Sequence, residues 1–166
     1  MRYWGTITGL ALVLAATTSL HALPASAAEI AAAAQHVMLT PDQVKWQPAP
    51  ALGPGLQLAI LSGDSFRAGA QFVFRIKMPD GAKVPPHWHP VEEHVTVISG
   101  TFLYGVGDKF DEHRLRELPQ GSYAFMPSGT RHFAMAKGEV VTQQDGIGPF
   151  KVFYVNPADD PSKTSK

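Results

Sequence analysis

The chain has 166 residues, of which 45% are apolar, and its 14 Lys and Arg residues balance its 14 Asp and Glu residues. A net charge of zero argues against nucleic-acid binding, which depends on clustered Lys and Arg. The lack of cysteine excludes a disulfide framework, a thiolate metal site and a cysteine nucleophile.

The N-terminus has the layout of a secretory signal peptide that spans residues 1–27. Arg2 precedes an apolar run from Ile7 to about Leu20, and residues 25–27 read Ala-Ser-Ala, an A-x-A cleavage pattern. A retained membrane anchor fits less well, because the run is shorter and more polar than the ~20 apolar residues of a membrane span. We therefore expect a periplasmic or secreted protein with no membrane attachment after cleavage.

The rest of the chain divides into three parts. Residues 28–55 are rich in Ala and Pro and are predicted to be an N-terminal extension, with one short helical turn that starts at Thr40. Residues 56–156 alternate short apolar runs with Gly and Pro turn signals, which predicts an all-β domain. Residues 157–166 are predicted to be a polar tail.

The expected strands are short and regularly spaced. They cover residues 56–61, 70–78, 93–99, 101–107, 122–126, 131–137, 139–144 and 150–155. The strands on either side of Gly100 are expected to form a hairpin, and the charged stretch 111–117 is a connection with some helical character. No helical stretch is long enough for crossover connections, so the pattern favours an antiparallel sandwich or barrel.

Three histidines and a glutamate carry the chemistry that the pattern indicates. His87 and His89 are two residues apart, so in extended chain they face the same side. If Glu93 faces them, two imidazoles and a carboxylate converge on one point, which suits a divalent transition metal. His132 shares a strand face with the small residues Ala134 and Ala136 and is the natural fourth ligand.

The same residues resemble the two motifs of the cupin superfamily. Gly81, His87, His89, Glu93 and Gly100 match the first motif, G-x5-H-x-H-x3-E-x6-G, at every position. The second motif, G-x5-P-x-G-x2-H-x3-N, is matched at Gly121, Pro127, Gly129 and His132, whereas Ala136 stands where the motif has Asn. That Asn is not one of the usual ligands, so the departure bears on the shape of the pocket more than on the metal.

The resemblance implies an all-β fold, an antiparallel double-stranded β-helix or jelly-roll barrel, with a metal inside. It implies that His87, His89, Glu93 and His132 bind one divalent transition metal ion, with Zn, Mn, Cu, Fe and Ni left open. Such sites support dioxygenase, decarboxylase, lyase and isomerase chemistry on small organic molecules. The alternative is a non-catalytic cupin that binds or senses a small ligand outside the cytoplasm.

Several other polar residues are weighed against this site. Strand parity places His94 and Glu92 away from the metal, and Glu92 would replace Glu93 only if the chain path shifted by one residue. The candidates for the pocket wall are Tyr104, Gln143, Arg75 and Gln71. No catalytic residue is assigned from the sequence. We also expect a homodimer, by analogy with the fold.

Overall fold

The computed structural model describes residues 36–163, so the predicted signal peptide lies outside the described residues. In this part of the chain the regular structure is almost entirely antiparallel strand, in one nine-stranded sheet. The strands are β1 (Gln47–Pro48), β2 (Gln57–Gly63), β3 (Gln71–Met78), β4 (Lys83–Trp88), β5 (Glu93–Val106), β6 (Arg116–Pro119), β7 (Tyr123–Met126), β8 (His132–Ile147) and β9 (Phe153–Tyr154). The helical segments are 3-10 turns: η1 (Pro41–Gln43), η2 (Glu112–Arg114), η3 (Pro157–Asp159) and η4 (Pro161–Lys163).

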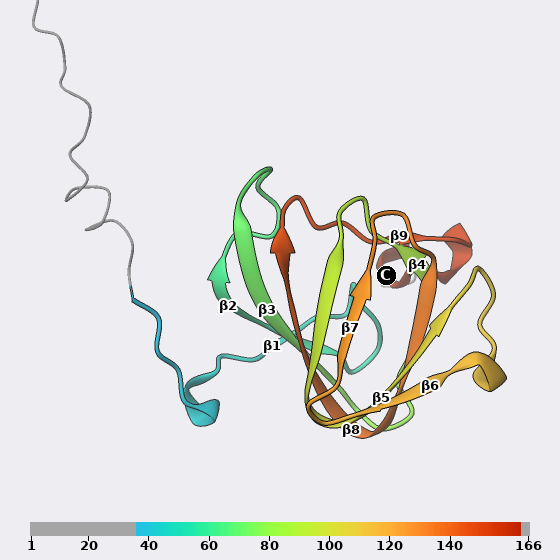
Figure 1. Ribbon diagram of the computed structural model, residues 1–166, viewed down its shortest axis with the longest axis horizontal. Coiled ribbons are helices and arrows are strands. Elements are labelled where there is room, and N and C mark those ends of the chain that lie inside the picture. Colours follow the sequence, from blue (N-terminus) through green and yellow to red (C-terminus); the bar gives the residue numbers. More distant parts are fainter. Residues whose placement is uncertain (1–35, 164–166) are drawn as a thin grey trace, which may run out of the picture. The chain divides into compact units, whose positions relative to one another are not determined.

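Two long strands, β5 and β8, belong to both halves of the sheet. The first half of β5 pairs with the second half of β8, beside β3, β2 and β1 on one side and β7 on the other. The second half of β5 pairs with the first half of β8, beside β4 and β9 on one side and β6 on the other. The sheet therefore curls over itself (Figure 1), and the predicted antiparallel jelly-roll barrel is confirmed.

The hairpin expected around Gly100 is wrong. Residues on both sides of Gly100 belong to β5 and pair with the same partner strand, which passes through Gly138 without ending. Gly100 adopts a φ of +78°, and a Cβ there would collide with the carbonyl oxygen of Glu139. Only glycine tolerates both conditions, so it marks a bend inside a strand in place of a chain reversal.

The bend also changes which residues face inward. Before Gly100 the inward-facing residues of β5 have odd numbers and include Glu93 and Val95, whereas after it Phe102 and Tyr104 are buried in the core cluster. The register between β5 and β8 shifts on both sides of Ser99, where the strand bends. As a result Glu93 and Tyr104, which would lie on opposite faces of a straight strand, meet inside the barrel.

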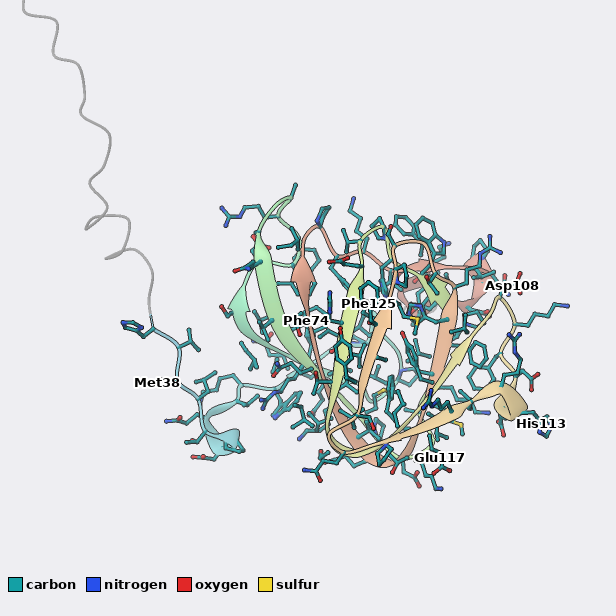
Figure 2. The ribbon with its side chains drawn as sticks, viewed as in Figure 1. Met38, Phe74, Asp108, His113, Glu117 and Phe125 are labelled. Carbon is teal, nitrogen blue, oxygen red and sulfur yellow. The ribbon has the colours of Figure 1, made fainter. Side chains whose placement is uncertain are left out.

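The core lies between the two halves of the sheet. It is built from buried residues of β3, β5 and β8, among them Met78, Val97, Phe102, Ala134 and Val140. In β3 the predicted alternation holds, since Phe72, Phe74 and Met78 are buried and Ile76 packs against the core. Figure 2 shows Phe74 directed from β3 toward the barrel interior.

The segments outside the barrel wall are short. The helical turn predicted at Thr40 is present as η1, and its capping box joins Thr40 and Gln43. The stretch predicted to be an N-terminal extension also supplies β1, which pairs with β2. Within residues 36–163 there is no helix with the length and apolar character required to cross a membrane.

Candidate metal centre

Three histidines gather inside the barrel at one end of β4. His87 lies in β4 and pairs with His132, the first residue of β8, and His89 follows β4 directly. All three side chains are buried, and one ligand nitrogen from each lies within 4.8 Å of the others. The sequence brings them together because β4 and β8 are adjacent, although 45 positions separate His87 from His132 in the numbering.

Backbone carbonyls fix which nitrogen of each imidazole is free. Nδ1 of His87 lies 2.8 Å from the oxygen of Pro85, and Nδ1 of His89 lies 2.8 Å from the oxygen of Lys151. Nδ1 of His132 lies 2.9 Å from the oxygen of Thr130. A carbonyl oxygen only accepts, so each Nδ1 carries the proton and each Nε2 keeps its lone pair. This is the arrangement in which histidine binds a metal through Nε2 while its other nitrogen is held in place.

Glu93, the first residue of β5, lies beside two of these nitrogens. Its Oε2 is 3.4 Å from Nε2 of His132, and its Oε1 is 3.8 Å from Nε2 of His89. Tyr104 donates a hydrogen bond of 2.8 Å from its hydroxyl to Oε2 of Glu93. The carboxylate is therefore oriented by Tyr104 and lies beside the imidazoles of His89 and His132.

Burial dominates the electrostatics of this cluster. It lowers the pKa of His89 and His132 to about 4, and it lowers the pKa of His87 well below its usual value of 6.5, with the neighbouring His132 and His89 adding to the effect. Burial likewise raises the pKa of Glu93 to about 7, although the hydrogen bond from Tyr104 acts in the opposite direction. The histidines are thus held neutral, as metal ligands must be.

The residues present fit a divalent transition metal ion. Within residues 36–163, the buried side-chain polar atoms without a hydrogen-bond partner are Nε2 of His89 and Oε1 of Gln144. A nitrogen that is buried and unpaired costs stability unless something binds it. A cation among the three Nε2 atoms would bind that nitrogen and would also offset the burial of Glu93, so the donor set has the chemistry of a metal centre.

A cavity of about 430 Å³ adjoins the cluster. His87, His89, His132, Glu93 and Tyr104 form one part of its lining. Most of the remaining wall is apolar and includes Leu56, Phe74, Ile76, Met78, Phe102 and Phe150. A small molecule in this space would therefore lie against hydrocarbon and meet its main polar contacts at the metal centre.

The structure separates the residues that were candidates for the pocket wall. Tyr104 lines the cavity, whereas Gln71, Arg75 and Gln143 do not. Arg75 and Gln143 are paired across β3 and β8, and Nε of Arg75 donates to Oε1 of Gln143 at 3.2 Å. Both lie on the face of the sheet opposite to the buried Phe74, which is why they are outside the cavity.

Two residues of the cavity wall that the sequence analysis did not identify lie on β8, on the face opposite to Gln143. Thr142 and Gln144 are buried and line the cavity. Like His132 they have even numbers, and residues two apart in a strand share a face, so this pattern could have identified them. Ser65, in the turn after β2, also lines the cavity.

His94 and Glu92 lie outside the cavity, on the side that parity indicated. Nδ1 of His94 is 2.7 Å from the hydroxyl of Tyr123, and Nε2 of His94 is 3.5 Å from Oε1 of Glu92. Trp88, between two of the clustered histidines, stacks on Phe153 with ring centroids 4.5 Å apart and is not part of the lining. His113 lies exposed in the loop between β5 and β6 (Figure 2).

The jelly-roll barrel and the histidine cluster inside it define a cupin. Comparison with protein families gives the particular branch: residues 34–150 match the model described as the ChrR cupin-like domain, and the chain belongs to this family. No curated protein matches the chain.

Solved structures share the fold at low sequence identity. The polyketide cyclase RemF from Streptomyces resistomycificus has a TM-score of 0.64 at 18% identity, over 78% of this chain and 92% of that one. An RmlC-like cupin from Ralstonia eutropha JMP134 has a TM-score of 0.59 at 19% identity, over 78% of both chains. An RmlC-like cupin from Shewanella frigidimarina NCIMB 400 has a TM-score of 0.53 at 20% identity, over 68% of this chain and 89% of that one. At such identities the likeness extends to the fold and not to the reaction.

Proposed function

We propose that this protein is a metal-dependent enzyme that acts on a small, largely apolar organic molecule inside its barrel. The observation that carries the proposal is the position of the histidine cluster, which forms the main polar part of a largely apolar cavity of about 430 Å³. The ligands we assign to the metal are His87, His89, His132 and Glu93. A divalent metal held there would polarise an oxygen of the substrate or lower the pKa of a bound water.

The lining indicates the class of substrate. Among the described residues that line the cavity, Lys151 is the one Lys or Arg, and it is exposed. A cavity without a buried cationic clamp does not suit a polyanion such as a sugar phosphate. It suits a compact molecule that presents one oxygen to the metal and hydrocarbon to the wall, such as a phenol or a diketone.

Tyr104 and Glu93 are two groups that can hold a proton beside the histidines. The Tyr104 hydroxyl donates to Oε2 of Glu93 at 2.8 Å. Burial and the Glu93 carboxylate raise the pKa of Tyr104 well above 10, so its proton stays in place near neutral pH. We assign Tyr104 the role of orienting Glu93 and stabilising its charge beside the substrate.

A second candidate function is ligand binding without turnover. It is favoured by the same hydrogen bond, because the proton of Tyr104 is directed to Glu93 and both groups are thereby occupied. In a protein that only binds or senses its ligand, no side chain needs to transfer a proton to it.

We further propose that the protein works in the periplasm or outside the cell, on the basis of the signal-peptide pattern in residues 1–27. Arg2 is followed by Tyr3, so there is no twin arginine, and export of an unfolded chain is expected. A chain that folds after export acquires its metal there, where affinity order favours copper and zinc and where availability can select manganese instead, so we expect zinc, copper or manganese. Metal analysis of protein isolated from its own cell envelope tests this, and stoichiometric iron would contradict it.

The experiment for the proposed function combines metal loading with a substrate screen. The protein is loaded separately with zinc, manganese, copper, iron and nickel and incubated with small phenols, diketones and carboxylic acids, with oxygen uptake and products measured. We expect one metal to support conversion of an apolar oxygen-bearing compound, and His132→Ala to lose both metal and conversion while His94→Ala retains both. Tight binding of such compounds without conversion under any metal would favour the second candidate, and no binding at all would contradict both.

A further inference from the structure

A second polar point lies in the wall of the cavity, outside the histidine cluster. Gln144 is 4% exposed and lines the cavity, and its Oε1 has no hydrogen-bond partner. The residues opposite it in the sheet are Phe74 on β3 and Val95 on β5, both apolar. A buried amide oxygen among apolar neighbours weakens the fold unless a partner satisfies it.

A hydrogen bond to Thr142 positions the amide. Its Nε2 donates to Oγ1 of Thr142 at 2.9 Å, and Thr142 is itself buried on the same face of β8. This hydrogen bond uses one of the two N–H groups of the amide and leaves Oε1 without a partner. The pair Thr142 and Gln144 therefore presents an acceptor to whatever fills the cavity.

Strand register places this acceptor close to the metal centre. Gln144 pairs with Val95, and Glu93 lies two residues before Val95 on the same inward face of β5. Diagonal neighbours of this kind in an antiparallel pair have Cα atoms ~7–8 Å apart. One small molecule can therefore contact both the cluster of histidines and Oε1 of Gln144.

We propose that Gln144 is a specificity residue that accepts a hydrogen bond from a hydroxyl or N–H group of the ligand. The ligand then carries two polar groups on a compact apolar frame, an oxygen that binds at the metal centre and a donor that reaches Gln144. This inference rests on the proposed function and narrows it, since an apolar molecule with one oxygen and no donor would leave Gln144 unsatisfied.

The test compares ligands that differ only in a donor. Zinc-loaded protein is titrated with resorcinol and 3-methoxyphenol, and with hydroquinone and 4-methoxyphenol, and the dissociation constants are measured by calorimetry. Each methoxy compound keeps the second oxygen but cannot donate from it. We expect at least one hydroxyl compound to bind about tenfold more tightly than its methoxy counterpart, because a site built for a donor rejects the analogue without it.

Variants assign that preference to Gln144. In Gln144→Met the preference falls to within about twofold and the zinc content is unchanged, because the side chain keeps its size and loses only its polar atoms. Gln143→Met, one residue away and outside the cavity, keeps the preference. The double variant Thr142→Val/Gln144→Met removes both buried polar partners, and its melting temperature without ligand is expected to equal or exceed that of the wild type.

The outcomes separate this inference from the proposed function. If the wild type binds neither these four compounds nor the diketones and carboxylic acids of the substrate screen, the proposed function fails. If it binds diketones, which carry no donor, but none of the four, the role of Gln144 is overturned while the proposed function stands. If it binds the four compounds with no preference for a donor, or if Gln144→Met keeps the preference, the role of Gln144 is likewise overturned while the proposed function stands. A clear loss of thermal stability in the double variant would show that the pair serves the fold, and would also overturn the inference.

Discussion

Two clusters of the same residue types lie on opposite faces of the chain around β5. The inner cluster joins Glu93, Tyr104 and the three buried histidines, with the Tyr104 hydroxyl 2.8 Å from Glu93. The outer cluster joins Glu92, His94 and Tyr123, with the Tyr123 hydroxyl 2.7 Å from His94. The side chain of Glu93 is 8% exposed and that of Glu92 is 56% exposed.

The difference shows that composition alone does not make a metal centre. The outer cluster offers one imidazole, which water and Tyr123 can satisfy. The inner cluster offers three imidazoles whose Nδ1 atoms are all fixed by carbonyls, so three lone pairs are directed at one buried point. Burial of these groups costs free energy, and a cation bound among them would offset that cost.

The largest expected effect comes from removing an inner ligand. His89→Ala and His132→Ala should weaken metal binding more than about 100-fold, beyond the 10–100-fold typical of groups that only support a ligand. His94→Ala, the matched change in the outer cluster, should leave the affinity nearly intact. Competition with a chelator of known affinity measures all three. Equal losses would mean that the two faces of β5 have been assigned wrongly.

The two tyrosines give the next largest contrast. Tyr104→Phe removes the donor that orients Glu93, and we expect metal affinity to fall about 10- to 100-fold. Tyr123→Phe removes a hydroxyl from the outer cluster, and we expect a change within about twofold, as for most surface substitutions. The same chelator competition compares them, and similar affinities for the two variants would argue against a supporting role for Tyr104.

In the metal-free protein, the inner histidines and Glu93 have opposite effects on how the free energy of unfolding depends on pH. The inner histidines have their pKa lowered, to about 4 for His89 and His132, so between pH 6.5 and 4.5 they bind protons only in the unfolded chain. Glu93 has its pKa raised to about 7, so in the same range it binds a proton only in the folded chain. On unfolding, the chain therefore takes up three protons at the histidines and releases one from Glu93, a net uptake of two. The free energy of unfolding should fall by ~2–3 kcal/mol for each pH unit of acidification.

Urea unfolding of chelator-treated protein at several pH values measures that slope. Glu93→Gln removes the opposing proton and should steepen the slope by about 1.4 kcal/mol per pH unit. His94→Ala should leave it unchanged. A slope near zero in the wild type would contradict the neutral, buried state of the inner histidines.

The smallest expected contrast concerns the bend in β5 at Gly100. Gly100→Ala places a Cβ at a φ of +78° and against the carbonyl of Glu139, and should cost about 2 kcal/mol or more. Gly121→Ala has a similar φ of +85° but open space around the added Cβ, so it should cost only about 1 kcal/mol. Urea unfolding measures both variants, and equal costs would mean that the close approach at the bend is unimportant.

Local spacing accounts for much of the site. A period of two places His87 and His89 on one side and His94 on the other, and the barrel fold follows from short strands between Gly and Pro turns. The same reasoning fails at Gly100, because glycine occurs both at bends within a strand and at turns between strands, and the sequence does not distinguish the two. It also fails for Arg75 and Gln143, since a polar strand face can line a cavity or meet solvent, and only the neighbouring strand decides between them.

The central claim is that three histidine nitrogens and Glu93 hold one metal ion inside the barrel. X-ray absorption at the zinc edge of the zinc-loaded protein tests it most directly. We expect one zinc per chain with three imidazole nitrogens at ~2.0–2.1 Å and oxygen from a carboxylate or water in the remaining positions. Substoichiometric zinc, or a spectrum with only one imidazole ligand, would contradict the claim.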